Sequence, residues 1–273
     1  GLHRALLRGR ELGCETIQLF TKSARQWAAR DLRPEEVDRF RQVGRETAIA
    51  PVIAHEAYLT NLAAPQAELF EKSVEAFYRE LLRAEQLGIP LLVVHPGFHL
   101  GAGEAAGLAR VVEAIDRVHA RGGALRVQIV LESTSGQGTA IGYTLEHLAA
   151  LREGVRDPER VGICLDTAHL FAAGYDFRTE AGYAGMMARF EALLGLAALK
   201  VIHLNDSKKG LGSRIDRHEH IGQGAIGLEG LAHFLRDPRL HPLPMILETP
   251  KETEAADARN LAVLRRLRAT PGV

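Results

Sequence analysis

The sequence predicts a parallel (β/α)8 barrel, the TIM-barrel fold, on three observations. Short apolar runs rich in β-branched residues alternate with longer amphipathic stretches. The connections between them are short, which favours right-handed crossovers within one parallel sheet. The apolar runs are nearly continuous, which indicates strands that are buried on both faces. At 273 residues the chain suits one large α/β domain, and we expect residues 1–273 to form it.

The chain opens with a predicted helix, residues 2–13, which Gly13 closes before a strand at 15–20. A barrel starts with a strand, so we expect the first strand and its loop, about ten residues, to be missing here. Further helices are expected at 34–46, 66–87, 104–120, 144–151, 179–194 and 256–267. Further strands are expected at 49–54, 91–94, 127–131, 161–165, 199–204 and 245–247. Seven strands therefore alternate with helices.

Composition narrows the class of protein. Lysine plus arginine equals aspartate plus glutamate, 34 each, so any attraction to a polyanion has to be local. Cys14 and Cys164 lie in apolar runs without metal-ligand spacing, which favours buried thiols and a reducing compartment. No apolar run approaches the roughly 18 residues of a membrane span, and no signal peptide is visible. We expect a soluble, cytoplasmic monomer with no membrane partner.

Six predicted strands end at a histidine or a carboxylate. These residues are His55, His95, Glu132, Asp166, His203 and Glu248, at intervals of 40, 37, 34, 37 and 45 residues. Each interval matches one strand–helix unit. In a closed barrel the carboxyl ends of all strands meet at one face, so the six side chains would surround one cavity. A single histidine after a strand is more often a structural residue. Six strands that each end at a histidine or carboxylate indicate a functional site.

Three further donors lie close to these strand ends. His169 follows Asp166 by three residues, and Asp216 and His218 lie in the polar stretch after the strand at 199–204. By itself that stretch could equally be a solvated loop. Histidine and carboxylate are the usual ligands of zinc, manganese and iron, and so many carboxylates would repel one another without cations. Nine donors suggest two or three ions, with His99 and His220 as candidates for the surrounding shell.

Several segments together carry a family resemblance. They are FTKSARQW, AHEAYLTNLA, HPGFHLGAG, ESTSGQG, CLDTAHLFAAGYD, HLNDSKK with GSRIDRHEHIGQG, and ILET. Across residues 2–267 the chain resembles the endonuclease IV family of apurinic/apyrimidinic (AP) endonucleases. It departs from the family at the first strand, which is absent, and at Gln223, where a charged residue is common. Neither departure touches a predicted ligand.

The resemblance implies a barrel with three Zn²⁺ ions, for which Mn²⁺ or Fe²⁺ could substitute. The implied ligands are His55, His95 and bridging Glu132 for one ion, Glu132, Asp166, His203 and Glu248 for a second, and His169, Asp216 and His218 for a third. It assigns catalysis to Glu132, His169, Asp216, His218 and Glu248. It also implies that Arg25, Gln26, Tyr58 and Leu59 contact double-stranded DNA at an abasic site. Without the family match, Arg25 and Tyr58 would be interpreted as ordinary amphipathic surface side chains.

The implied reaction is hydrolysis of the phosphodiester 5′ of an abasic site, which leaves a 3′-hydroxyl, together with cleaning of blocked 3′ ends. Zinc lowers the pKa of bound water toward about 7 and so supplies a hydroxide nucleophile. Four carboxylates against three dications leave a local charge of +2, which can hold a phosphate on a neutral protein. Flipping a nucleotide out of the duplex costs least where the base is already lost.

Two other functions stay open from the sequence. A sugar isomerase or epimerase of the same barrel superfamily would need only one metal site, for which Glu132, Asp166, His203 and Glu248 suffice, but the other five donors would have no role. A non-catalytic module that binds damaged DNA would need metal sites with no open coordination position. The number of metal ions per chain separates the first alternative from the nuclease.

Overall fold

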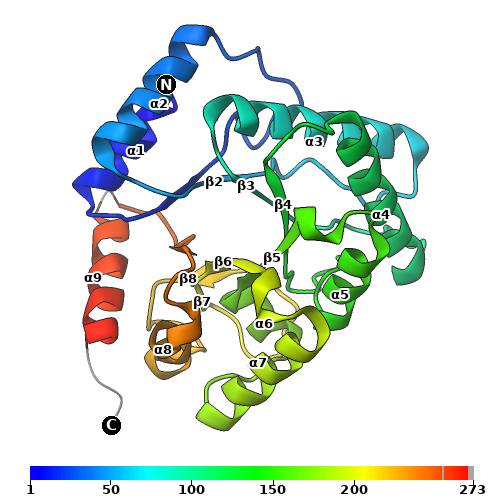
Figure 1. The fold of residues 1–273 in the computed structure, drawn as a ribbon. Helices are drawn as coiled ribbons and strands as arrows, with labels where there is room; N and C mark the ends of the chain where they lie inside the picture. Colours follow the sequence, from blue (N-terminus) through cyan, green and yellow to red (C-terminus); the bar gives the residue numbers. More distant parts are fainter. Residues whose placement is uncertain (254, 270–273) are drawn as a thin grey trace. The chain divides into compact units, whose positions relative to one another are not determined.

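The computed structural model describes residues 1–253 and 255–269. The chain divides into two compact units, one made of Gly1–Leu131 and Ala150–Gly162, the other of Glu132–Ala149 and the residues from Ile163 onward. Each unit contains parallel strands connected through helices (Figure 1). Our expectation of one domain over residues 1–273 stays a prediction.

Helices and strands alternate through the first unit. Its elements are α1 (His3–Glu11), β1 (Ile17–Leu19), α2 (Pro34–Thr47), β2 (Val52–His55), α3 (Ala67–Leu87), β3 (Leu91–Val94), α4 (Glu104–Arg121) and all but the last residue of β4 (Gln128–Glu132). The strands lie in chain order in parallel ladders, with Leu19 level with Ala54 and Val94 level with Leu131. Helix α1 packs against α2, and α3 packs against α4 (Figure 1).

The remaining elements continue the same alternation. They are α5 (Leu145–Gly154), η1 (Pro158–Arg160), β5 (Val161–Asp166), α6 (Thr167–Ala173), α7 (Glu180–Leu194), η2 (Leu196–Ala198), β6 (Leu199–His203), β7 (Asp206–Ser207), β8 (His218–Glu219), α8 (Gly227–Arg236), η3 (Pro238–Leu240), β9 (Met245–Ile246) and α9 (Ala256–Ala269). Strands β5, β6 and β9 are parallel, which brings Asp166 level with His203 and His203 level with Ile246. Strands β7 and β8 form a separate antiparallel pair.

Burial explains why the strands read as continuous apolar runs. All six residues of β5 are buried, and so are the last three residues of β2 and of β3. Both faces of such strands are covered, which is the normal state of a parallel sheet with helices outside it. In the second unit, Phe177 packs edge-on against Phe171 and Phe234, with ring centroids 6.1 and 5.2 Å away. This aromatic cluster anchors α6 and α8 to the core.

Local signals set the helix ends. Pro34 occupies the first turn of α2, where its missing N–H costs nothing, and Glu36 accepts a hydrogen bond from the backbone N–H of Arg33. Gly88 ends α3 in the left-handed conformation at φ 75°, which a residue without Cβ adopts without strain. Proline in the first turn of a helix and glycine just after its end are both signals that a sequence shows directly.

All seven predicted strands are present as β1–β6 and β9, with boundaries within three residues. The predicted helices correspond to α1, α2, α3, α4, α5, α7 and α9. The sequence analysis did not predict α6, α8 or the β7–β8 pair. It placed His218 in an irregular loop, whereas His218 begins β8. No helix in the described part of the chain combines the length and apolar character needed to cross a bilayer.

Candidate metal centre

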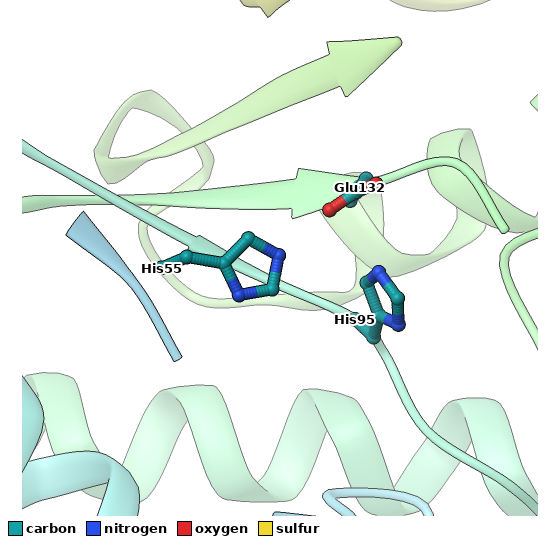
Figure 2. A group of neighbouring side chains, drawn as sticks. All are labelled: His55, His95 and Glu132. Carbon is teal, nitrogen blue, oxygen red and sulfur yellow. The ribbon is translucent and has the colours of Figure 1, made fainter. Parts of the chain in front are cut away.

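The ends of β2, β3 and β4 bring three of the predicted ligands together. His55 pairs with Val93 in the ladder, and Val94 pairs with Leu131, so His95 and Glu132 are the next residues of adjacent strands. The rings of His55 and His95 are 5.4 Å apart between centroids and nearly perpendicular. Figure 2 shows both imidazoles with the carboxylate at the end of β4. Each of the three side chains offers a ligand atom within 4.8 Å of the others.

His55 is held in one orientation by its surroundings. Its Nδ1–H donates to the backbone carbonyl oxygen of Glu56 at 2.8 Å. Phe20 and Tyr58 lie against the ring, at 5.5 and 6.2 Å between centroids, and the side chain is buried. A ring nitrogen that donates to a backbone carbonyl fixes the tautomer and leaves the other nitrogen as a metal ligand. His55 therefore fits a ligand that binds through Nε2.

Four donors gather at the ends of β4, β5, β6 and β9. Nδ1 of His203 lies 3.1 Å from Glu132 Oε1, 3.2 Å from Glu248 Oε2 and 3.8 Å from Asp166 Oδ2. The ligand atoms of all four residues lie within 4.8 Å of one another. Glu132, Asp166 and His203 are fully buried, and Glu248 is half-buried. Three carboxylates around one imidazole are a donor set suited to a divalent cation.

A third group forms where α6 meets β8. Nε2 of His169 lies 3.2 Å from Asp216 Oδ1, and Nε2 of His218 lies 3.6 Å from the same oxygen. The two imidazole rings are 5.4 Å apart. Asp166 is also near, with its Oδ2 3.6 Å from His218 Nε2. All three residues that the sequence analysis added to the strand-end donors therefore lie together.

Both histidines of this group are oriented in the way that metal ligands are. Nδ1–H of His169 donates to the backbone oxygen of Ser133 at 2.8 Å, and that of His218 donates to the backbone oxygen of Glu248 at 3.0 Å. Each Nε2 is thereby directed at Asp216. Nε2 of His218 is buried and has no hydrogen-bond partner among the described residues. A cation between His218 and the carboxylate would satisfy that nitrogen, so the residues present fit a metal ion.

Neighbouring carboxylates shift the pKa values of two buried histidines, His169 and His203. Burial alone lowers the pKa of His169, but the charge of Asp166 and hydrogen bonds to Asp216 and Glu132 raise it well above the ordinary value. Burial also lowers the pKa of His203, yet Cys164 and then Glu248 and Glu132 raise it well above that value. The cluster therefore favours positive charge at its centre. A divalent cation supplies that charge and displaces the protons.

The residues that support the ligands are ones the sequence analysis did not single out. Nδ2 of Asn205 donates to Asp166 Oδ2 at 2.6 Å, and its Oδ1 accepts from the backbone N–H of Glu248 at 2.7 Å. Oε1 of Gln137 accepts from the backbone N–H of Asp216 at 2.9 Å. Only the polar composition of HLND and SGQG hinted at these roles. Their partners are 39 to 79 residues away in the chain, so no local pattern could identify them.

The two candidates for the surrounding shell have other partners. Nδ1 of His99 accepts from the backbone N–H groups of Gly101 and Gly103, at 3.3 and 3.0 Å, and so closes its own turn. His220 bonds through Nε2 to Glu252 at 3.0 Å and through Nδ1 to the Asn260 amide at 3.0 Å. His99 therefore supports its own turn, whereas His220 joins its segment to Glu252 and to α9.

The predicted DNA-contacting residues lie on the loops after β1 and β2. Arg25 and Gln26 are exposed, Tyr58 is 63% exposed and Leu59 is 37% exposed. The backbone N–H of Tyr58 donates to the Ala24 carbonyl oxygen at 3.2 Å, which joins the two loops. Large apolar side chains with this exposure, on loops that also carry a candidate ligand, are suited to a partner rather than to the core.

Comparison with known proteins identifies the family. Residues 6–267 match the family of xylose isomerase-like TIM barrels. A protein called probable endonuclease 4 from Chloroflexus aurantiacus is 53% identical over 268 residues, which are 98% of this chain and 94% of that protein. A protein with the same name from Geobacter sulfurreducens is 46% identical over 98% of this chain and 90% of its own length. The chain belongs to the endonuclease IV family.

Solved structures agree with this family assignment. The crystal structure of endonuclease IV from Thermus thermophilus superposes with a TM-score of 0.88 at 38% identity and covers 98% of this chain and 94% of that one. A D-tagatose 3-epimerase-like protein superposes with a TM-score of 0.70, but at 17% identity it shows the fold alone. The fold is a TIM barrel, as the sequence predicted, and the protein is a nuclease with clustered metal-binding groups.

Proposed function

We propose that this protein is a DNA repair endonuclease that hydrolyses the phosphodiester 5′ of abasic sites and leaves a 3′-hydroxyl. It would also act as a phosphodiesterase that cleans blocked 3′ ends. The observation that carries the proposal is the convergence of nine predicted donors into three groups at the carboxyl ends of the strands. The relatives named endonuclease 4 support the same reaction class.

The donor groups suggest how three Zn²⁺ ions would be held. His55, His95 and Glu132 would hold one ion, Glu132 with Asp166, His203 and Glu248 a second, and His169, Asp216 and His218 a third. Glu132 occurs in two of these groups, which suits a bridging carboxylate. The same nitrogen and oxygen donors would also accept Mn²⁺ or Fe²⁺. When bound, zinc supplies Lewis-acid stabilisation of phosphoryl charge and activates water for hydrolysis.

The protein's own residues position the substrate phosphate. We assign catalysis to Glu132, His169, Asp216, His218 and Glu248 because they belong to the donor groups whose cations would face the phosphodiester. Their four carboxylates, counting Asp166, leave a local charge of +2 with three dications bound. That charge attracts a phosphate although the chain as a whole has a net charge of +0. No side-chain general acid is needed when cations stabilise the leaving oxygen.

Recognition of the lesion would depend on the two joined loops. Tyr58 and Leu59 would fill the space left by the missing base, and Arg25 with Gln26 would contact the backbone of the duplex. A nucleotide without a base leaves the stack at low cost, so extrusion itself selects damaged DNA. We further propose that the protein acts in the cytoplasm, as a single-domain monomer, on double-stranded DNA.

The sugar isomerase remains the second candidate function because epimerase structures share the fold. Glu132, Asp166, His203 and Glu248 alone would serve it. The third donor group argues for the nuclease, since an isomerase has no use for His169 and His218 with ligand atoms within 3.6 Å of Asp216. A non-catalytic DNA-binding module is the weaker alternative, given the nuclease family.

One experiment tests the proposal. A duplex with a single abasic analogue is incubated with purified protein whose zinc content has been measured. We expect about three zinc ions per chain and a nick on the 5′ side of the lesion. A chain that holds one ion, does not nick and converts a ketose would establish the isomerase instead. Tight binding of the abasic duplex without a nick would favour the binding module.

A further inference from the structure

A carboxylate that is not among the predicted ligands has an unusual set of hydrogen bonds. Asp206, in β7, is fully buried, and its two oxygens accept five backbone N–H groups. The donors are Ser207, Ile226 and Gly227 on Oδ1, at 2.8, 3.1 and 3.4 Å, and Gly222 and Gly224 on Oδ2, at 2.9 and 3.0 Å. Its acceptor capacity is therefore taken up by backbone donors, so it is not available as a metal ligand.

These hydrogen bonds close one continuous segment, residues 207–227, which we call the donor loop. The loop leaves Asp206 along β7, returns along β8 and reaches the start of α8 beside the same carboxylate. Within it, Ser207 is level with His218, and the backbone N–H of Ala225 donates to the Ser207 oxygen at 2.8 Å. The donor loop carries Asp216 and His218, two of the three donors of the third group.

Gly224 shows how closely the loop approaches the carboxylate. A Cβ atom at this position would lie 2.4 Å from Asp206 Oδ1 and 2.4 Å from the backbone oxygen of Ser207. Neither atom can move without breaking hydrogen bonds to the loop. Glycine is needed at this position because the backbone itself is in contact with the carboxylate.

We propose that Asp206 is the positioning residue of the third metal site, which holds the donor loop so that Asp216 and His218 face His169. The proposal rests on the proposed function, since it assumes that these three donors bind an ion. Asp216 itself is half exposed. Its backbone N–H donates to Gln137, and the donor loop that carries it is closed at both ends on Asp206. A loop released from Asp206 would have to be ordered by the ion, which lowers the affinity for that ion.

The first test is the substitution Asp206→Asn. The amide presents N–H groups to N–H donors on one of its two sides, so two or three of the five hydrogen bonds are lost. We expect zinc affinity at one site to fall about 10–100-fold, so that dialysed protein retains about two ions instead of three. Nicking should fall with it, and excess zinc should restore most of the activity because every ligand is still present. Asp216→Ala lacks a ligand, so excess zinc should not restore it.

A second variant guards against a general loss of folding. Gly224→Ala leaves Asp206 and all ligands in place but pushes the loop off the carboxylate, so it should reproduce the zinc loss and the rescue by excess zinc. The matched controls are Asp237→Asn and Gly185→Ala. Asp237 is also buried and accepts the Arg239 N–H at 3.0 Å and the Tyr183 hydroxyl at 2.8 Å, and a Cβ atom on Gly185 would meet nothing within 4 Å among the described residues. Both controls should keep three ions.

The outcomes distinguish this inference from the proposed function. A parent protein that neither binds a third ion nor nicks abasic DNA refutes the proposed function, and this is seen before any variant is compared. If the parent does both, and folded Asp206→Asn or Gly224→Ala keeps three ions at the parent's affinity, the positioning role of Asp206 is overturned. Equal zinc loss in Asp237→Asn would also overturn it, because the effect would then be general.

Discussion

At the scale of single residues, the third donor group is where the nuclease and the isomerase make opposite demands. Replacing His169, Asp216 or His218 by alanine removes one ligand and leaves Glu132, Asp166, His203 and Glu248 intact. The charge on the phosphoryl oxygens in the transition state would then be poorly stabilised, which raises the activation free energy by about 3 kcal/mol or more. We expect nicking of abasic DNA to fall at least ~100-fold while the protein stays folded, as seen by cooperative thermal unfolding. Unimpaired nicking by all three variants would exclude a role for this group.

The exposed side chains of the joined loops should affect binding rather than metal content. Arg25→Ala and Tyr58→Ala each remove a side chain that is not itself a predicted metal ligand. Loss of one aromatic or arginine anchor at an interface costs about 1–3 kcal/mol. We therefore expect the Kd for an abasic duplex to rise about 5- to 150-fold in a binding assay, with the zinc content unchanged. The control is Tyr78→Ala, which removes an aromatic side chain of α3 that packs against the Arg121 guanidinium and should leave DNA binding unchanged. Parent-like binding by both variants would make them ordinary surface residues.

At the scale of elements, one asparagine connects the loop after β2 to the loop after β3. Oδ1 of Asn61 accepts from the backbone N–H groups of Phe98 and Ala63, at 2.8 and 3.1 Å, and its Nδ2 donates to the Phe98 oxygen at 2.9 Å. A Cβ atom on Gly97 would lie 2.3 Å from that Oδ1. The two hydrogen bonds between the Asn61 amide and the Phe98 backbone resemble those between neighbouring β-strands. They connect the loop that follows His55 to the loop that follows His95.

Asn61→Ala should therefore destabilise the fold as well as the first donor group. It leaves backbone groups of Phe98 and Ala63 without their partner, which costs about 1–3 kcal/mol. We expect a lower urea midpoint and weaker zinc binding at one site. Gln42→Ala, which removes an exposed amide bonded to Glu46 on α2, should change stability by less than about 0.5 kcal/mol. An Asn61→Ala variant as stable as the parent would show that the two loops keep their positions without the hydrogen bonds of Asn61.

Helix α4 contains a histidine that should make stability depend on pH. Burial, followed by the positive charge of Arg160, lowers the pKa of His119 from 6.5 to about 4. Between these two values the unfolded chain takes up a proton that the folded chain does not, so stability is lost as the pH falls from 6.5 towards 4. After allowance for solvent screening, we expect this proton uptake to lower the free energy of unfolding by about 1–2 kcal/mol.

The measurement is denaturant unfolding at pH 7 and at pH 5, compared between the parent and His119→Leu. The difference in unfolding free energy between the two pH values should be smaller in the variant, because leucine does not titrate. Equal differences in the two proteins would mean that His119 does not contribute to the acid sensitivity.

At the scale of the whole molecule, the donor groups tie folding to metal binding. Without cations the carboxylates repel one another, and His169 and His203 hold protons that metal ions would displace. Ligand at about 1,000 times its Kd stabilises a protein by about 4 kcal/mol. We expect a strong chelator to abolish nicking and to lower the Tm by about 8 °C or more, since this stabilisation applies to each ion. Added zinc should restore both, and magnesium, which prefers all-oxygen sites, should not. Chelated protein with the Tm and activity of the parent would contradict the metal dependence.

The sequence by itself determined the strand and helix order and the strand-end donors. Strand signals are local, because an apolar run of four to six residues followed by a polar turn identifies both the strand and its carboxyl end. The residue after that run then lies at the active face of a barrel, which is how His55, His95 and Glu132 were found. Helix α6 was not predicted because it has seven residues, too few for a periodic pattern, and its N-cap is the predicted ligand Asp166.

The tertiary structure alone decided the distances between the donors and the hydrogen bonds that hold them. Sequence spacing could not show that Asp216 lies 3.2 Å from His169, since the two residues are far apart in the chain and meet only in the folded structure. Nor could it show that Asn205 supports Asp166, while His99 bonds within its own turn and His220 bonds to Asn260. Hydrogen bonds between residues many positions apart depend on side-chain directions that only the packed fold defines, and such bonds leave no periodic trace in the sequence.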